Sequence, residues 1–407
     1  MIKNNKNLLA GWQKVKLEEV AEIVMGQSPS GESYNEIGDG LPFYQGVTEF
    51  NEKFVSIKKY TNQPTKIVEK NTILFSVRAP VGRVNFIKWK ACIGRGNAGM
   101  VMKNGNQDFL YFLLKFLEKE IQNYTSGTVF TSISGKELKN ILVTIPENPE
   151  EQKSIAKILS SFDDKIELLR EQNETLEKMG EVIFKEWFGK YKVDDDLPEG
   201  WRVGRLSEIA EFINGYAFKS KDLLKEYSVD TYKIFKMGDI KKGGGFNPDK
   251  TKSYIKKDDF VQNNKYILKS GDLLMSMTDM KDAVSLLGHT ALMIYDNEYV
   301  VNQRVGLIRA NNEINIEYPY LYLLTNNKDF ISNLRGRANS GVQINLSTGV
   351  IKSSEVIIAD KDFNKNFNEK VKPLFEKIKN NSEQIQTLSK TRDILLPRLM
   401  KGEVLLD

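Results

Sequence analysis

The strongest constraint on the fold of this chain is that it contains the same unit twice. Residues 11–26 read GWQKVKLEEVAEIVMG and residues 200–215 read GWRVGRLSEIAEFING, so a Trp, a Leu and a final Gly recur in register. Further pairs follow in the same order: TILFSVRAPVGRV with DLLMSMTDMKDAV, CIGRGNAGMVM with VVNQRVGLIRA, and SGTVFTSIS with SGVQINLS. An internal repeat of this kind fixes the architecture before any other feature. It predicts two similar domains related by a pseudo-two-fold axis.

Each copy ends in a segment with apolar residues at alternating steps of four and three. This spacing is typical of helices that pack together through knobs-into-holes contacts, and one Asn in each seam, at different layers, favours a defined register. A helix of about 40 residues is roughly 60 Å long, more than one domain can cover. The alternative is that each helix packs on its own domain. The predicted seam residues are Leu159, Phe162, Ile166, Leu169, Asn173, Leu176, Ile183, Val371, Leu374, Ile378, Asn381, Ile385, Leu388 and Leu395.

The first of these helices has clear ends, whereas the second does not. Asn148 is a predicted cap, Pro149 suits the first helical position, and Gly189 is a predicted terminator. In the second helix, Pro373 and Pro397 each remove a backbone donor, so we expect a kink or a break near them.

Between the helices, short β-type runs alternate with Gly, Asn, Asp and Pro turns, which predicts mixed α/β domains. Residues 106–124 and 317–335 each predict one amphipathic helix, and the polar segment 193–201 predicts a linker. The fold class is therefore α+β, with two similar mixed α/β domains separated by two long helices. The predicted parts are a first recognition domain (1–146), a central helical spacer (147–192), a second recognition domain (193–359) and a C-terminal helical spacer (360–407).

The composition excludes several kinds of site. With one His (His289) and one Cys (Cys92), the chain cannot build a His/Cys zinc site or an internal disulfide, and no metal site is predicted. No phosphate-binding GxxxxGK[ST] loop and no Asn/Asp-Pro-Pro-aromatic methyltransferase motif occurs. No apolar run could span a membrane, the N-terminus lacks the features of a secretory signal, and the single Cys cannot close a disulfide, so we expect a cytoplasmic protein. With one His, a histidine-based mechanism would rest on a single residue, and no catalytic residue is predicted.

Basic residues cluster beside polar and small ones at corresponding places in the two copies. Arg can bind guanine with two hydrogen bonds, Asn and Gln can do the same with adenine, and Lys, Ser and Thr suit phosphates. Any one of these cations could equally be a solvated surface charge, but the recurrence favours double-stranded DNA binding. The candidates are Lys58, Lys59, Arg78, Arg83, Arg95, Asn97, Thr128 and Thr131 in the first copy, and Lys241, Lys242, Thr278, Lys281, Gln303, Arg304, Arg335, Arg337 and Gln343 in the second.

Several segments resemble one known family. LPEGWRVGRLSEIAEFINGYAFKS, PENPEEQKSIAKILSSFDDKIELLREQNETLEKM, EVIFKEWFGKY and TRDILLPRLMKGEV are similar to parts of the specificity subunits of type I restriction-modification systems. The resemblance implies that each domain reads one half of a bipartite DNA target and that the two helices pack antiparallel. It also implies a non-catalytic subunit that recruits two adenine methyltransferase subunits and, in the full enzyme, restriction subunits. S-adenosylmethionine, ATP and Mg are then expected on those partners, and none on this chain.

The resemblance and the residue patterns together predict that the helices set the distance between two half-sites. Residues 146–199 hold 15 acidic and 8 basic residues, so this segment is expected to face protein partners rather than DNA. Two other classes of function stay open at this point. One is an autonomous DNA methyltransferase or nuclease with fused recognition domains, and the other is a coiled-coil scaffold without a DNA role.

Overall fold

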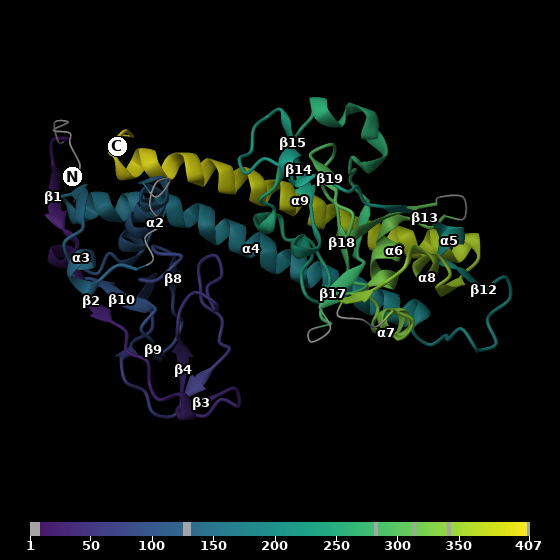
Figure 1. Cartoon of the computed structure of the whole chain (residues 1–407), viewed down its shortest axis with the longest axis horizontal. Coiled ribbons are helices and arrows are strands. Elements are labelled where there is room, and N and C mark those ends of the chain that lie inside the picture. The colour runs from purple at the N-terminus through teal and green to yellow at the C-terminus, as the bar shows by residue number, and fades with distance from the viewer. Residues whose placement is uncertain (1–8, 125–131, 281–283, 312–314, 340–342, 405–407) are drawn as a thin grey trace. The chain divides into compact units, whose positions relative to one another are not determined.

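The computed structural model describes residues 9–124, 132–280, 284–311, 315–339 and 343–404, with the backbone alone at 119–124 and at 249. The chain divides into two compact units (Figure 1). The first unit comprises Met1–Leu168 and Ile385–Asp407, and the second comprises Leu169–Gln384. Each unit therefore combines one copy of the repeat with part of each long helix.

The first unit contains three small sheets. An antiparallel pair joins β1 and β11, a four-stranded sheet has the order β2-β10-β7-β8, and a five-stranded sheet has the order β3-β5-β4-β9-β6. The strands are β1 (Trp12–Lys16), β2 (Ala21–Met25), β3 (Tyr34–Asn35), β4 (Leu41–Tyr44), β5 (Tyr60–Thr61), β6 (Ile67–Val68), β7 (Ile73–Ser76), β8 (Val84–Phe86), β9 (Ala91–Ile93), β10 (Asn97–Met102) and β11 (Leu142–Pro146). The shorter helices are α1 (Leu17–Val20), η1 (Gly31–Ser33), α2 (Gln107–Tyr124) and α3 (Gly135–Lys139).

The second unit repeats this arrangement strand for strand in two of its sheets. The pair β12-β22 corresponds to β1-β11, and the order β13-β20-β16-β18 corresponds to β2-β10-β7-β8. The strands are β12 (Arg202–Arg205), β13 (Ala210–Asn214), β14 (Thr231–Phe235), β15 (Tyr254–Lys256), β16 (Leu273–Ser276), β17 (Thr278–Met280), β18 (Thr290–Leu292), β19 (Tyr299–Val301), β20 (Val305–Ala310), β21 (Gln343–Asn345) and β22 (Glu355–Ile358). The short helices are α5 (Leu206–Ile209), α6 (Tyr318–Thr325), α7 (Lys328–Gly336), α8 (Thr348–Lys352), η2 (Ser220–Asp222), η3 (Met237–Asp239), η4 (Pro248–Lys250) and η5 (Asp258–Tyr266).

The residues that recur in the sequence occupy recurring structural positions. The indole Nε1 of Trp12 donates to Glu151 at 3.0 Å, and that of Trp201 donates to Asp360 at 3.2 Å, which ties the first strand of each copy to the start of a long helix. The recurring glutamates, Glu19 and Glu208, accept from the backbone at the start of α1 and α5. The predicted duplication is therefore confirmed in three dimensions.

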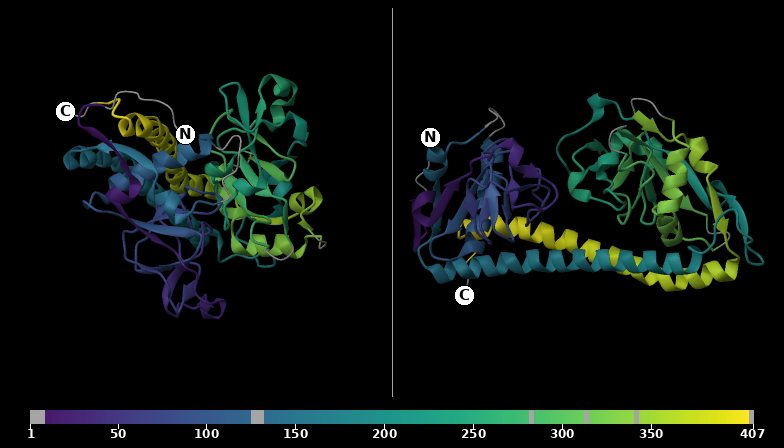
Figure 2. Two further views of the ribbon diagram at one scale, coloured as in Figure 1. Left: turned by 60° about the vertical axis from the view of Figure 1, so that its left-hand side comes forward. Right: turned by 90° about the horizontal axis from the view of Figure 1, so that it is seen from below.

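Each long helix is continuous over 40 residues: α4 spans Pro149–Phe188 and α9 spans Lys361–Met400. Asn148 caps α4 as predicted, because its side chain accepts from the Glu150 N–H at 3.0 Å. In each unit the sheets lie against that unit's portion of the helix pair (Figure 2).

The two helices pack antiparallel within each unit. In the first unit Asp163 of α4 pairs with Arg392 of α9, with 2.6 Å between Oδ1 and Nη1. In the second unit Phe184 of α4 contacts Phe367 of α9, with ring centroids 6.1 Å apart. The predicted seam residues are buried or half-buried throughout. The alternative that each helix packs on its own domain alone is therefore wrong.

Three details of the sequence prediction are wrong. The break expected near Pro373 or Pro397 does not occur, because α9 is one continuous helix over Lys361–Met400. On either side of Pro373, Val371 and Phe375 are buried in the core. The seam asparagines lie at one layer instead of two, since Asn381 donates to Asn173 at 2.9 Å.

The third concerns residues 317–335, which form two helices, α6 and α7, instead of one. The break falls at the adjacent asparagines 326 and 327. Asn327 caps α7 by accepting from the N–H groups of Asp329 and Phe330, and this side chain competes with a continuous helix.

The cores of the units combine sheet, domain helix and long helices. In the first unit the buried faces of α2 and β7 pack against Leu159 of α4 and Leu399 of α9. In the second unit α6 and β16 pack against Phe184 of α4 and Phe367 of α9. Burying a side chain of this size stabilises a fold by about 1.5–3 kcal/mol. The domains are thus held by the long helices themselves.

Candidate nucleic-acid interface

In the first unit, four loops at the ends of core strands are joined by backbone hydrogen bonds. Gly94 N donates to Tyr44 O at 2.9 Å, Val77 N donates to Gly96 O at 2.9 Å, and Ile133 N donates to Val77 O at 2.9 Å. We name this surface the first loop face and define it as residues 45–47, 78–80, 94–96 and 132. These backbone bonds hold the loops together, and Gln45, Arg78 and Arg95 are exposed on the face that the loops form.

The second unit builds the corresponding surface with corresponding bonds. Asn302 N donates to Phe235 O at 3.0 Å, Met277 N donates to Arg304 O at 3.2 Å, and Leu346 N donates to Met277 O at 2.9 Å. We name it the second loop face and define it as residues 236–238, 278–280, 302–304 and 343–346. The two faces share a backbone frame but carry different side chains.

Glycines make this close approach of loops possible. A Cβ on Gly26 would lie 2.2 Å from Gly94 O, and a Cβ on Gly215 would lie 2.0 Å from Asn302 O. No side chain fits at either place. The last Gly of each sequence repeat is therefore required by the loop that packs on it.

A hollow of about 200 Å³ lies on the first loop face, lined by Gln45, Gly46, Val47, Arg78, Ala79 and Gly96. The Ala79–Pro80 peptide bond beside it is cis. An exposed arginine at the wall of this hollow suits contact with an electronegative partner.

Six of the predicted DNA contacts fall on these two faces. Arg78 and Arg95 are exposed on the first, and Gln303 and Arg304 are exposed on the second. Thr278 and Gln343 are half-buried on the second, where the strands that carry them, β17 and β21, pair with each other. Six candidates chosen from the sequence therefore lie on the two loop faces of the folded chain.

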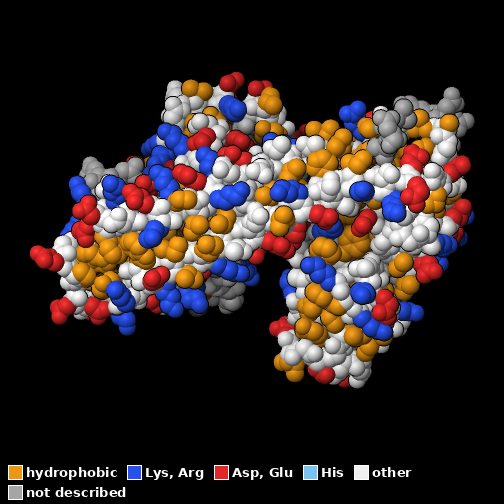
Figure 3. Space-filling view, turned by 180° about the vertical axis from the view of Figure 1, so that it is seen from behind, with side chains coloured by type: hydrophobic (Ala, Val, Ile, Leu, Met, Phe, Trp, Pro, Cys, Tyr) orange, Lys and Arg blue, Asp and Glu red, His pale blue; other side chains and the backbone are white. Residues whose placement is uncertain are grey.

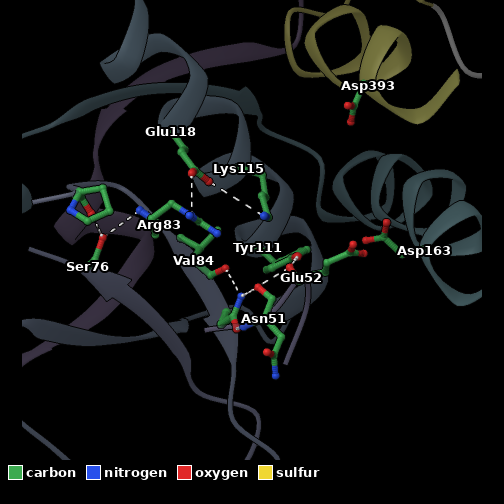
Figure 4. Close-up of polar contacts among 12 residues, drawn as sticks. Asn51, Glu52, Ser76, Arg83, Val84, Tyr111, Lys115, Glu118, Asp163 and Asp393 are labelled. Atoms are coloured by element: carbon green, nitrogen blue, oxygen red, sulfur yellow. Dashed lines mark hydrogen bonds and ion pairs between the residues drawn. The ribbon is translucent and has the colours of Figure 1, made fainter. Parts of the chain in front are cut away.

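Two predicted contacts of the first copy have structural partners instead. The amide of Asn97 is buried and donates to the carbonyls of Tyr44 at 3.0 Å and Gly46 at 3.1 Å, so it holds a loop in place. Arg83 forms an ion pair with Glu118 of α2, with 3.1 Å between Nε and Oε1 (Figure 4). Neither side chain is presented freely on the first loop face.

Four predicted lysines lie outside the loop faces. Lys58 and Lys59 are exposed on the segment before β5, and the Lys58 ammonium donates to Thr48 O at 2.6 Å. Lys241 and Lys242 are exposed at the start of the glycine turn 243–245, whose glycines all have positive φ. The charge of Lys241 lowers the pKa of Glu177 on α4, but the burial of Glu177 outweighs it and raises that pKa.

The arginines at the end of α7 are held by the protein. Arg335 Nε donates to Leu287 O at 2.9 Å, and burial lowers the pKa of its guanidinium. Arg337 donates to Ser353 Oγ at 2.6 Å. Of the remaining candidates, Thr128, Thr131 and Lys281 lie outside the described residues.

Sequence reasoning missed Gln45 and Ser28. Ser28 Oγ donates to Gln45 Oε1 at 3.0 Å and accepts from Arg95 N at 3.2 Å, so it links two loops of the first face. Ser28 comes two residues after the recurring Gly26, but the recurring segments do not include Gln45, so no sequence signal indicated it.

A buried carboxyl also lies below each loop face. Glu49 O accepts from Ser56 N and Asp239 O accepts from Asn247 N, which gives the two acids the same place in their loops. Burial raises the pKa of both carboxyl groups, that of Asp239 to about 6.

His289 is half-buried in the second unit, and its Nδ1 lies 3.4 Å from Asn326 Oδ1. Burial lowers the pKa of this imidazole.

Among the described residues, no group of three or more His, Cys, Asp or Glu side chains could hold a metal ion. No helix in the described part of the chain is long and apolar enough to cross a membrane.

Comparison with known proteins gives one consistent result. Residues 10–178 and 198–390 each match the family described as type I restriction modification DNA specificity domain. The type I restriction enzyme MjaIX specificity subunit of Methanocaldococcus jannaschii is 28% identical over 425 residues, which cover 97% of this chain and 93% of that relative. The MjaX specificity subunit of the same organism is 43% identical over 176 residues, or 42% of this chain and 41% of that relative.

A solved structure shares the fold. The crystal structure of the type I restriction-modification system S subunit from M. genitalium matches with a TM-score of 0.56 and 18% identity, over 98% of both chains. Since the family match covers both copies of the repeat, the chain belongs to the type I restriction-modification DNA specificity family.

Proposed function

We propose that the first and second loop faces each bind one half of a bipartite double-stranded DNA target. The chain is the specificity subunit of a type I restriction-modification system, and it selects the DNA on which that system acts. The observation that carries the proposal is the shared backbone frame of the two faces, with Arg78 and Arg95 on one and Gln303 and Arg304 on the other. Similar frames with unlike side chains suit two different half-sites.

The recognition domains are proposed to span 1–146 and 193–359, and the helical spacers 147–192 and 360–407. In this proposal the α4–α9 pair sets the distance between the half-sites. Paired helices that keep one register along their seam are stiff enough for this role.

Two methyltransferase subunits are proposed to dock on the helices. Val182 of α4 and Ile394 of α9 stand at the same place in the two copies, 212 residues apart, and are 66% and 61% exposed. We take these equivalent exposed positions as the docking points for two copies of one partner. Hydrophobic side chains gather in patches among charged ones on the face shown in Figure 3.

The catalytic groups are proposed to lie on the partners, which would bind S-adenosylmethionine and, in the restriction subunits, ATP and Mg. The chain is proposed to work in the cytoplasm, together with the double-stranded DNA that it is proposed to bind.

The direct test is genome-wide mapping of methylated adenine in the host with and without this gene. We expect a two-part sequence motif to be methylated only when the gene is present. Replacement of Arg304 by Ala should relax the sequence requirement in one half of that motif. Equal relaxation of both halves would contradict the proposal.

A further inference from the structure

Arg95 and Gln303 occupy the same position in two equivalent turns. The first turn joins β9 to β10, and the second joins β19 to β20. Gln27 N donates to Ile93 O at 3.0 Å and Tyr216 N donates to Val301 O at 2.9 Å, which fixes the strand before each turn. Two residues later, Arg95 and Gln303 stand at equivalent positions, and both are exposed. The two units thus present different side chains from one backbone position.

The backbone of both turns is restricted. The carbonyl oxygen of Gly94 packs against Gly26, where a Cβ would lie 2.2 Å from it. The carbonyl oxygen of Asn302 packs in the same way against Gly215, where a Cβ would lie 2.0 Å from it. In the first unit Arg95 N also donates to Ser28 Oγ at 3.2 Å. A side chain on such a fixed turn can be aimed with little loss of backbone entropy.

The pair of residue types favours contact with bases over contact with phosphates. A position that neutralised a phosphate would be expected to hold a cation in both copies, but Gln303 carries no charge. Arg and Gln share the ability to form two hydrogen bonds to one purine edge, Arg with guanine O6 and N7 and Gln with adenine N6 and N7.

From these observations we infer that the equivalent turns read different bases. Arg95 reads a guanine in the first half-site, and Gln303 reads an adenine in the second. The inference rests on the proposed function and adds the base that each turn selects.

The residue after Arg95 is Gly96, and the residue after Gln303 is Arg304, so the second turn carries one more side chain than the first. A Cβ on Gly96 would lie 2.3 Å from Gln45 O, so the first unit allows only Gly there. The second unit has the exposed Arg304 at that position. The second turn therefore offers two adjacent long side chains where the first offers one.

The test uses the full chain, expressed with the methyltransferase subunits of its own system in a host that lacks adenine methylation. The methylated motif of the wild type is mapped first. If no two-part motif is found, the proposed function fails before the inference is tested. If one is found, the motif is mapped again for Arg95→Ala, Arg95→Lys and Gln303→Ala. Lys90→Ala and Gln262→Ala serve as exposed controls in the same units.

We expect Arg95→Ala and Arg95→Lys to lose discrimination at one G·C pair in one half-site, because lysine keeps the charge but lacks the two-pronged guanidinium. Gln303→Ala should lose discrimination at one A·T pair in the other half-site. Each loss should be about 5- to 150-fold, and the controls should leave the motif unchanged. The inference is overturned if the relaxed pair is of the other class, if Arg95→Lys behaves as wild type, if both halves relax, or if neither does.

Discussion

Asn381 on α9 donates a hydrogen bond from Nδ2 to Oδ1 of Asn173 on α4, at 2.9 Å, within the helix seam of the second unit. Asn173 in turn donates to Ser382 Oγ at 3.1 Å. Asn381 is fully buried, so its amide depends on partners inside the protein. A polar layer of this kind favours the one register in which the two amides meet.

Replacement of Asn381 by Leu should therefore destabilise the chain by about 1–3 kcal/mol, because the Asn173 amide would lose its buried partner. The double replacement of Asn173 and Asn381 by Leu should recover most of that loss. Urea unfolding of the wild type, both single variants and the double variant measures the coupling between the two residues. Strictly additive losses would show that the amides do not act as a pair.

The buried acid below the second loop face predicts a pH dependence. Burial raises the pKa of Asp239 from 3.8 to about 6. The folded chain then binds a proton between pH 4 and 6 that the unfolded chain releases, so Asp239 makes stability fall as the pH rises through this range. Asp239→Asn should remove up to about 3 kcal/mol of this fall.

The measurement is urea unfolding at pH 4 and pH 7, with Asp259→Asn as a control, since Asp259 is exposed in the same unit. An identical pH dependence in the wild type and Asp239→Asn would refute the account of this residue.

The exposed pair on the long helices predicts the stoichiometry of the complex. Val182→Asp and Ile394→Asp should each leave a chain that binds one methyltransferase subunit instead of two, and the double variant should bind none. Mass measurement of the purified complexes distinguishes these states. Val261→Asp is the matched control, because Val261 is 63% exposed but lies in η5, away from the long helices. Two bound subunits in the double variant would place the docking site elsewhere.

The sequence predicted most where one local pattern decides the structure. The helix spanning 149–188 follows from its heptad seam and from Asn148, whose cap needs no distant partner. The sequence analysis missed the break in 317–335, although Asn is a preferred capping residue and Asn327 caps α7. The Asn326 side chain bonds to Thr290, which is distant in sequence. The local cap and this tertiary contact together set where the helix breaks.

The candidate site was predictable in part for the same reason. The repeat aligned Arg78 with Thr278 and Arg95 with Gln303, and all four residues lie on the two loop faces. Asn97 was predicted to contact DNA from its residue type alone, but its amide donates to the carbonyls of Tyr44 and Gly46. Whether a polar side chain faces solvent or supports a loop depends on packing that a linear pattern does not contain.

A chain with both helices shortened by one heptad tests most directly whether the domains read the half-sites while the helices set their separation. Deletion of 165–171 and 384–390 keeps the seam in phase and shortens each helix by about 10 Å, or about three base pairs of DNA. Mapping of methylated adenine should then find both half-site sequences unchanged and the gap between them shorter by about three base pairs. An unchanged gap, or altered half-site sequences, would contradict the account.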